Sequence, residues 1–326
     1  MKLGLCAGVY LNRSLEEVFE ICGQIGVECL EIYCGDPKPT KHIDIQAILS
    51  SDKAMQDYLD RFKRRGIHIN AFSFGNNLVH PDPDVARGSW EIFKNAVLLC
   101  EKTGVEVLGV FSGTPGGCPN DRTPNWITCP WPDEYLAMSR YQWEDVLIPF
   151  WNKAAAFAQE HGLKKIGLEM HPGFTVYNPE TLLRLRGHVG SIIGSYFDPS
   201  HLMWQGMDPA LAILELEGTI FGAHAKDVYV NRDYIRRNGV NDAKHYGNVL
   251  KRSWTFRTVG YGHGEDTWRG VISALRCVGY DGAVNIEHED ILMSRDEGVK
   301  KAADFLRDIL VREKPEQMWW AAAADN

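Results

Sequence analysis

Glycines divide this chain into repeating units, because each of seven glycines ends a helix-like segment and precedes a short β-like run. The seven are Gly26, Gly66, Gly104, Gly162, Gly190, Gly218 and Gly279. Glycine commonly ends an α-helix because it adopts the left-handed backbone conformation without strain. Together with the N-terminal run LGLCAG, the repeat predicts eight strands that alternate with helices.

The segments between the predicted strands carry the signals of amphipathic helices. Leu15, Val18, Phe19 and Cys22 follow the spacing of one helix face. Polar helix starts precede several segments: the capping-box pairs Ser14/Glu17 and Ser294/Glu297, and the caps Asn178-Pro179 and Asp208-Pro209. This alternation of strand and helix predicts an α/β fold, a (β/α)8 TIM barrel. An open doubly wound sheet is the alternative, but no G-x-G-x-x-G sequence opens a helix here.

The chain of 326 residues shows no linker and no shift in composition that would divide it. We therefore expect a single barrel domain over 1–312, followed by a C-terminal tail over 313–326. The tail contains Trp319 and Trp320, which we expect to pack on this subunit or on a neighbour.

Composition excludes some classes of function. The chain has 35 Lys and Arg against 43 Asp and Glu, a net charge of −8, which argues against a general nucleic-acid binder. No apolar run approaches the ~20 residues of a membrane span, and the N-terminus lacks the features of a signal peptide. The eight cysteines form no C-x-x-C motif, so we expect reduced thiols in a cytoplasmic protein.

Two long loops are predicted, over 112–140 after the fourth strand and over 228–262 after the seventh. Disordered insertions are the alternative, but both segments are rich in aromatic residues. In a TIM barrel, loops that follow strands lie on the catalytic face. Trp126, Trp131 and Tyr10 could therefore stack on a sugar ring or on the aromatic part of a glycoside, or could belong to the core.

Polar side chains cluster where four later strands end: Glu169, Asp198, His224 and Glu287. Alternation along each strand turns these side chains toward the barrel axis and their apolar neighbours toward the helices. Isolated charges there would cost several kcal/mol each, a cost that a divalent cation removes. Three carboxylates and one imidazole suit Mn²⁺ best, with Mg²⁺, Co²⁺ or Zn²⁺ possible. The alternative is a set of core polar groups and salt bridges.

Five further residues near the same strand ends have two readings each. Lys226 could bind substrate or pair with a ligand carboxylate. Asp227 could be a further metal ligand, but we expect it behind the ligands, where it would orient a histidine. His171 could touch substrate or donate to a ligand carboxylate. His263 is a candidate for substrate binding, and His80 could bind substrate or fix the turn before Pro81.

Several motifs make the chain resemble a known superfamily over roughly 1–312. They are LEMHPG at 168–173, FDPSH at 197–201, HAKD at 224–227, IEHED at 286–290, NNLVHPD at 76–82 and GYGHGEDTW at 260–268. The chain resembles the xylose isomerase-like TIM-barrel superfamily, which includes D-tagatose 3-epimerase-like proteins, inosose dehydratase and endonuclease IV-like proteins. The resemblance implies that Glu169, Asp198, His224 and Glu287 hold one divalent metal. It also implies that Glu169 and Glu287 transfer protons and that His201 contacts substrate.

Proton transfer beside a carbonyl group, which the resemblance implies, agrees with the residue types. A metal that binds the carbonyl and an adjacent hydroxyl oxygen stabilises the enediolate formed on deprotonation. Return of a proton on the opposite face gives an isomerase or epimerase, which we rank first. Expulsion of a β leaving group gives the alternative, a lyase. This could be a dehydratase, or a deglycosidase that acts on 3-keto (C-)glycosides, as the C-glycoside deglycosidase catalytic subunits of the superfamily do with a small partner chain.

Other classes fit less well. Endonuclease IV-like proteins need an Asp-x-His pair after the seventh strand, and 228–262 contains none. A non-catalytic sugar-binding barrel would not require the four-ligand set. We expect a small sugar or glycoside as substrate, no nucleic acid, no membrane, and a possible homo-oligomer or small partner subunit.

Overall fold

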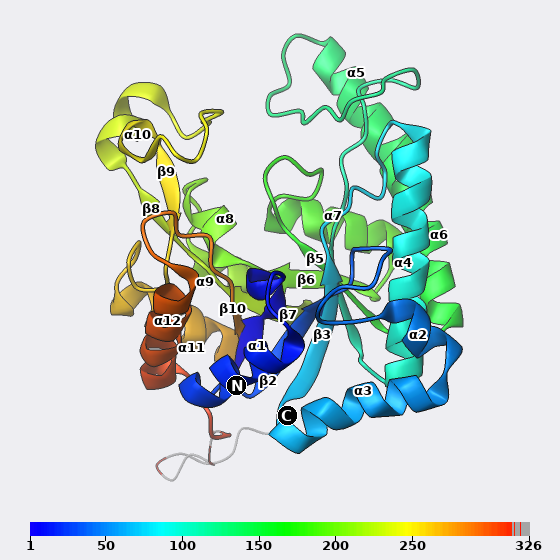
Figure 1. Cartoon of the computed structure of the whole chain (residues 1–326). Coiled ribbons are helices and arrows are strands. Elements are labelled where there is room, and N and C mark those ends of the chain that lie inside the picture. The colour runs from blue at the N-terminus through cyan, green and yellow to red at the C-terminus, as the bar shows by residue number, and fades with distance from the viewer. Residues whose placement is uncertain (315, 317–319, 321–326) are drawn as a thin grey trace.

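The predicted TIM barrel is confirmed by the computed structural model, which describes residues 1–314, 316 and 320. Eight parallel strands close in the order β1-β10-β7-β6-β5-β4-β3-β2. Figure 1 shows them at the centre of the molecule with the helices outside. The barrel strands are β1 (Lys2–Cys6), β2 (Cys29–Tyr33), β3 (His68–Phe74), β4 (Val107–Phe111), β5 (Lys165–Glu169), β6 (Ile193–Phe197), β7 (Ile220–Ala225) and β10 (Ala283–Ile286).

The glycine signal is correct at every position, because all seven predicted glycines have positive φ, from 66° at Gly66 to 115° at Gly190. The Ser14/Glu17 capping box is present, and the Ser294 side chain accepts from the backbone of Glu297. The surrounding helices are α1 (Leu15–Ile25), α2 (Ile45–Ser50), α3 (Asp52–Arg65), α4 (Pro83–Thr103), α6 (Ile148–Glu160), α7 (Pro179–Val189), α8 (Pro199–Met203), α9 (Pro209–Glu215), α11 (Glu265–Cys277) and α12 (Arg295–Ile309). A short 3-10 helix, η1 (Ala7–Tyr10), follows β1.

Both predicted long loops contain regular structure. The segment after β4 forms α5 (Glu134–Arg140), which leads through the π-helix η2 (Tyr141–Leu147) into α6. The segment after β7 forms an antiparallel hairpin of β8 (Asp227–Val230) and β9 (Trp254–Arg257), with α10 (Arg232–Asn238) and the 3-10 helix η3 (Val249–Lys251) between them. In Figure 1 the two segments rise as separate projections beyond the same end of the barrel.

One aromatic side chain fills the barrel beneath its mouth. The ring of Tyr196 lies where a Cβ added at Gly109 or Gly167 would come within 3.0 Å of it, and Gly222 faces the same ring still more closely. Glycines on β4, β5 and β7 therefore make room for one tyrosine from β6. Because this layer is packed, the polar groups above it form a floor rather than a channel.

Three further expectations concern the chain as a whole. All eight cysteines lie within the described residues and carry free thiols, as expected. Within the described residues, no helix is long and apolar enough to span a membrane. The division into 1–312 and a tail stays a prediction, because most of 313–326, Trp319 included, lies outside the described residues.

Candidate active site

The four predicted ligand residues come together at one end of the barrel. Glu169, Asp198, His224 and Glu287 each offer one ligand atom, and these atoms all lie within 4.8 Å of one another. They come from the ends of β5, β6, β7 and β10, which are neighbours in the barrel. Because all four strands are parallel, their carboxyl ends lie at the same end of the barrel, and we call this group of residues, together with Lys226, the floor of the barrel mouth.

The donor set fits a divalent cation. Among the described residues, the buried atom His224 Nδ1 makes no hydrogen bond, and Asp198 Oδ2 is held only by ion pairs, to Lys226 and His201. His224 Nδ1 lies 3.6 Å from Glu169 Oε2 and 3.4 Å from Glu287 Oε2. Buried polar atoms are rarely left without a partner. An imidazole nitrogen aimed at carboxylate oxygens is the arrangement that a bound cation would complete.

Lys226 adds a fixed positive charge to the same floor. Its side chain is 3% exposed, and Nζ lies 3.0 Å from both Asp198 Oδ2 and Glu287 Oε2. Glu289 Oε2 is a third carboxylate oxygen, 3.4 Å away. Lys226 is therefore paired with carboxylates of the predicted ligand set, which was one of its two interpretations. Its role toward substrate stays a prediction.

The floor also shifts the pKa values of its acids. Burial raises the pKa of Glu287 to about 7, although Lys226 and His224 oppose this rise. Burial likewise raises the pKa of Glu169. Burial would raise the pKa of Asp198 as well, but the nearby Lys226 ammonium holds it well below its ordinary value. Two neighbouring carboxyl groups that titrate above their usual range are suited to exchange protons near neutral pH.

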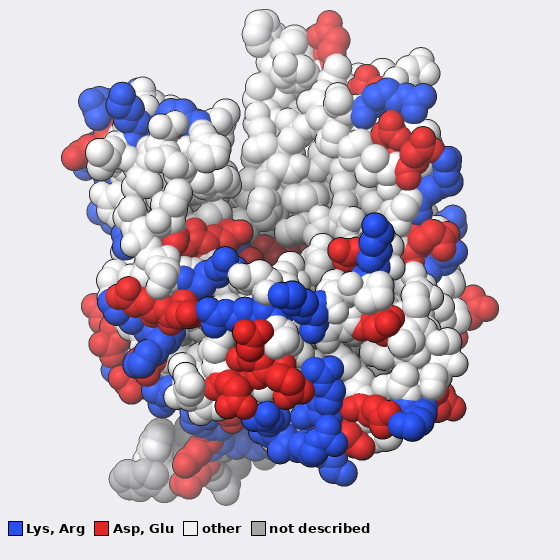
Figure 2. Space-filling model, in the orientation of Figure 1, with Lys and Arg blue, Asp and Glu red and all other residues white. Residues whose placement is uncertain are grey.

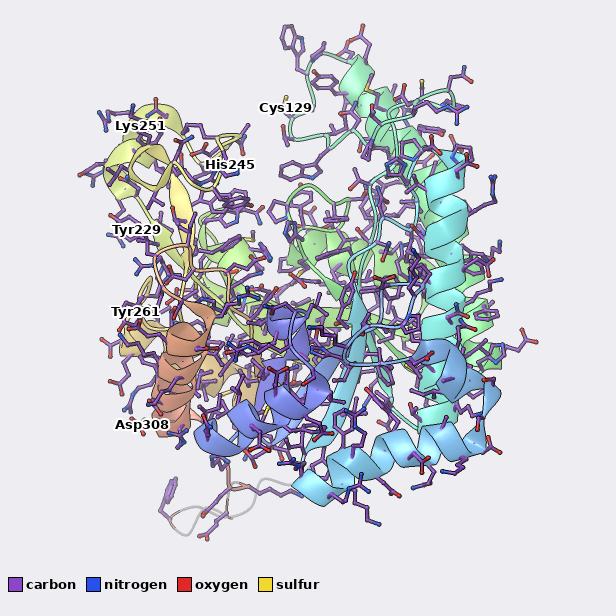
Figure 3. The ribbon with its side chains drawn as sticks, in the orientation of Figure 1. Cys129, Tyr229, His245, Lys251, Tyr261 and Asp308 are labelled. Carbon is purple, nitrogen blue, oxygen red and sulfur yellow. The ribbon has the colours of Figure 1, made fainter. Side chains whose placement is uncertain are left out.

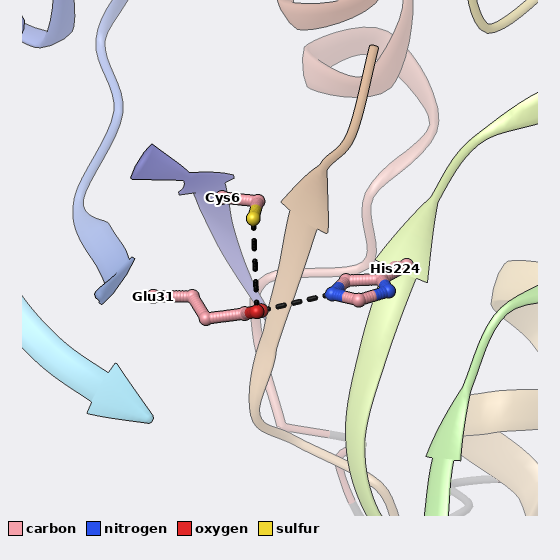
Figure 4. A group of neighbouring side chains, drawn as sticks. All are labelled: Cys6, Glu31 and His224. Carbon is pink, nitrogen blue, oxygen red and sulfur yellow. Dashed lines mark hydrogen bonds and ion pairs between the residues drawn. The ribbon is translucent and has the colours of Figure 1, made fainter. Parts of the chain in front are cut away.

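Sequence reasoning missed one buried acid of the site, Glu31 on β2. Figure 4 shows it between Cys6 and His224, and its Oε2 atom lies 2.9 Å from His224 Nε2. The same oxygen accepts from the Tyr196 hydroxyl at 2.6 Å and from Asn285 Nδ2 at 3.2 Å. Burial would raise the pKa of Glu31, but His224 and hydrogen bonds from Ser73 and Tyr196 lower it to about 2. A lone acid inside the otherwise apolar run CLEIY was the signal that could have identified it.

Two histidines connect the floor to the space above it. His201 Nε2 lies 3.0 Å from Glu169 Oε1 and 3.4 Å from Asp198 Oδ2, and its ring centroid is 4.0 Å from that of His171. Burial lowers the pKa of each histidine to about 3, so both are neutral near pH 7. Since Nε2 of neutral His201 faces two carboxylates, this nitrogen carries the proton and Nδ1 is left as an acceptor.

Three other predicted residues lie behind or beside this floor. Asp227 receives hydrogen bonds from the backbone of Gly260, Gly262 and His263, and its Oδ1 lies 2.9 Å from His263 Nδ1. Asp227 thus lies against a histidine, and its role in orienting that ring stays a prediction. His80 Nδ1 accepts from the backbone of Asp82, which agrees with the turn-fixing reading. Neither His80 nor His263 is among the residues that line the two cavities described next.

Two cavities meet this floor. The first, about 280 Å³, lies at the barrel mouth and is lined by Glu31, Glu169, His224 and Glu287 among others. The second, about 430 Å³, is lined by both long loops; its wall residues include Trp126, His171, His201, Trp204, Tyr246, Trp254 and Phe256. Figure 2 shows a hollow between the two projections with largely uncharged walls and acidic residues at its base. In Figure 3, Cys129 and His245 lie on the facing sides of the two projections.

The structure places the three aromatic candidates in three different environments. Trp126 lines the second cavity and packs edge-on against Tyr177 at 5.6 Å. Trp131, in the same loop, is 76% exposed and is not part of that wall. Tyr10 is 1% exposed and belongs to the hydrophobic core, which was the alternative reading for these residues.

Comparison with known proteins identifies the family. The sequence profile described as "Xylose isomerase-like TIM barrel" matches residues 19–309. The chain belongs to this family. The resemblance drawn from the motifs is thus confirmed, and an enzyme acting on sugars or related compounds is consistent with the activities named for structures of the same fold.

Individual matches add detail. The chain is 32% identical to the uncharacterized protein YfiH of Bacillus subtilis (strain 168) over 312 residues, which are 95% of this chain and 99% of YfiH. A probable 3-DHS dehydratase, AsbF from Bacillus anthracis, has the same fold with 14% identity and a TM-score of 0.65, over 94% of this chain and 99% of AsbF. The structure of the IOLI protein with a bound zinc atom is 18% identical in sequence with a TM-score of 0.64, and the match covers 95% of this chain and 98% of IOLI. A D-tagatose 3-epimerase-like protein is 21% identical with a TM-score of 0.60, and the match covers 95% of this chain and 98% of that protein.

Proposed function

We propose that this xylose isomerase-like barrel is a divalent-metal-dependent sugar isomerase or epimerase that transfers a proton beside the carbonyl group of a keto sugar. The observation that carries the proposal is the convergence of three carboxylates and one imidazole within 4.8 Å at the barrel mouth. Glu169, Asp198, His224 and Glu287 would hold the metal, which we expect to be Mn²⁺, with Mg²⁺, Co²⁺ or Zn²⁺ as alternatives. When bound, the metal would polarise the substrate carbonyl and stabilise the charge that develops on deprotonation.

The chain's own groups would move the proton. Glu169 and Glu287 line the same cavity and have raised pKa values, so one can accept a proton from carbon while the other returns one. His201 Nε2–H orients Glu169, and Lys226 balances negative charge beside Glu287. His201 Nδ1, which lacks a partner among the described residues, is placed to accept from a substrate hydroxyl.

Deuterium exchange tests this reaction. Protein loaded with Mn²⁺ is incubated with a series of ketoses in D₂O, and the sugars are examined by NMR. We expect deuterium at the carbon beside the carbonyl and formation of a second sugar isomer. No exchange in any ketose, with protein that retains its metal, would contradict the proposal.

The second cavity favours a second candidate, β-elimination from a 3-keto-glycoside. A monosaccharide in the cavity at the barrel mouth leaves the aromatic cavity of about 430 Å³ unfilled. A planar aglycone attached to the sugar would fill it, because aromatic walls stack on planar rings. The first step, loss of a proton beside the carbonyl, is common to both candidates; in the second, the electron pair then expels the aglycone.

The same D₂O experiment separates the candidates when it includes an aryl 3-keto-glucoside. Release of the phenol, with an unsaturated keto sugar as the other product, would support elimination. Deuterium exchange into ketoses with no phenol released would support the isomerase or epimerase. A homo-oligomer or a small partner subunit stays part of the proposal, and sedimentation of the purified chain tests it.

A further inference from the structure

The imidazole of His224 is held from behind by an acid on the far side of the barrel. Glu31 lies on β2, three strands away from β7 around the barrel, so the contact crosses the interior. Glu31 is 1% exposed and His224 is 6% exposed. The distance between Glu31 Oε2 and His224 Nε2 is 2.9 Å (Figure 4).

The position of this acid decides which ring nitrogen carries a proton. An ionised carboxylate only accepts hydrogen bonds, so His224 Nε2 must be the donor. The other nitrogen, Nδ1, points toward Glu169 and Glu287, at 3.6 Å and 3.4 Å. In a neutral imidazole with a proton on Nε2, the lone pair is on Nδ1, the nitrogen that faces the other three predicted ligands.

Glu31 is itself held in place. Its Oε2 atom accepts from the Tyr196 hydroxyl at 2.6 Å and from Asn285 Nδ2 at 3.2 Å, besides His224. Asn285 Nδ2 also lies 2.8 Å from the Tyr196 hydroxyl oxygen. The Tyr196 ring is in turn enclosed by glycines of three strands. A buried acid with several fixed partners can hold an imidazole with little freedom to rotate.

We propose that Glu31 is a positioning residue, which fixes the tautomer and the ring orientation of His224 so that Nδ1 binds the metal. The inference rests on the proposed metal site. Histidine ligands commonly donate their other ring nitrogen to a carboxylate in this way, and loss of such a partner typically costs about 10–100-fold in metal affinity.

A separate metal site at Cys6, Glu31 and His224 is the other reading, because their ligand atoms also lie within 4.8 Å of one another. The hydrogen bonds argue against it. Oε2 of Glu31 already accepts from three donors, which a cation would have to displace. Burial and the charge of Glu31 raise the pKa of Cys6 well above its ordinary value, which disfavours the thiolate form that binds metals.

The test uses Zn²⁺ affinity and NMR of the zinc-loaded, ¹⁵N-histidine-labelled protein. In the wild type we expect a slowly exchanging Nε2–H signal from His224 and a metal-shifted Nδ1. Glu31→Gln removes the charge with little change in shape, and we expect Zn²⁺ to bind about 10–100-fold more weakly. Glu16→Gln makes the same chemical change on the exposed face of α1, away from the barrel interior, so its affinity should stay within about threefold.

Each outcome bears on the inference. A folded Glu31→Gln protein with wild-type affinity overturns it, and so does a wild-type spectrum in which Nε2 is the metal-bound nitrogen. The second readout needs no variant, so a Glu31→Gln chain that fails to fold does not prevent the test. Weaker zinc binding by Glu31→Gln, without deuterium exchange by the wild type, supports the role of Glu31 and overturns the proposed reaction. A wild type that binds no divalent metal overturns both.

Discussion

The floor of the barrel mouth and the aromatic cavity above it are built in opposite ways. The floor consists of charged side chains at strand ends, and these pair with one another at 3.0 to 3.6 Å. The cavity above is contributed largely by the two long loops, and stacked aromatic pairs such as Trp204 and Trp254, 4.5 Å apart, form its walls. His201 lines the cavity and contacts Glu169 of the floor, so it belongs to both regions, and His171 lines the cavity with its ring against His201.

This contrast suits the floor to chemistry and the cavity to the choice of substrate. Strand ends are fixed by the hydrogen bonds of the barrel, which is what precise placement of charge requires. Loops vary without disturbing the barrel, so they are suited to select among substrates. If this is correct, changes to the floor should abolish chemistry and metal binding, and changes to the cavity should alter which substrates bind.

The largest effect is expected from Asp198→Asn on the floor. The change removes one ligand charge and leaves Lys226 without one of its partners. We expect metal affinity to fall by more than about 100-fold, because even residues behind the ligands are worth about 10–100-fold. Metal content of the purified protein, measured by mass spectrometry, checks this.

Asp308→Asn is the matched control, because Asp308 is exposed on α12, far from the barrel mouth in Figure 3. It should retain the wild-type metal content. If Asp198→Asn also retained it, the floor would not be the metal site.

A smaller effect is expected from Gly222→Ala, which adds a methyl group to the packed layer around Tyr196 beneath the floor. A Cβ added by Gly222→Ala would overlap the Tyr196 ring, which also lies against Gly109 and Gly167 and whose hydroxyl is bound to Glu31. Overpacking of this kind costs about 1–3 kcal/mol, so the midpoint of urea unfolding should fall.

Gly270→Ala provides the comparison. Gly270 lies in α11, and an added Cβ there meets nothing within 4 Å. This variant should be up to about 1 kcal/mol more stable, because alanine favours the helix. Equal behaviour of the two variants would show that the barrel interior is less rigid than we infer.

In the cavity, Trp126→Ala should weaken binding of an aryl glycoside and leave metal binding unchanged. Loss of one stacking face is worth about 1 kcal/mol or somewhat more, hence roughly a fivefold to tenfold weaker affinity. Titration of 4-nitrophenyl β-D-glucoside by calorimetry measures the change.

Trp131→Ala in the same loop is the control, because Trp131 is 76% exposed and does not line the cavity. Its affinity should equal that of the wild type. Equal losses in both variants would indicate a general effect on the loop, and no loss in either would leave the cavity without a role in binding aryl groups.

The smallest effect is expected at His80. Its Nδ1 atom accepts from the backbone of Asp82 at the start of α4, outside both cavities. His80→Ala should cost about 0.5–1.5 kcal/mol of stability, the net worth of one hydrogen bond, and change KM by less than about twofold. A larger rise in KM would restore His80 as a substrate-binding residue.

Much of this arrangement could be predicted because it depends on local rules. Helix C-caps at glycine, such as Gly26 with φ of 71°, depend only on neighbouring residues. Strand alternation then assigned Glu169, His224 and Glu287 to the inner face, and parallel strands brought their ends together. The residues of the candidate metal site could therefore be predicted one strand at a time.

Residues whose role depends on distant partners could not be found in this way. Glu31 is separated from His224 by 193 positions in the sequence, and nothing near it indicates which residue it contacts. Likewise, the sequence predicted that Trp126, Trp131 and Tyr10 were candidates of the same kind. Only the folded structure shows that Trp126 lines a cavity, that Trp131 is exposed and that Tyr10 lies in the core.

The sequence by itself determined the barrel, its eight strands and the side chains that face its axis, because backbone conformation and side-chain alternation are set by short-range sterics. Only the tertiary structure decided how those side chains pair across the barrel and what shape the loops enclose. These depend on contacts between segments far apart in the chain, whose geometry is fixed only when the barrel closes.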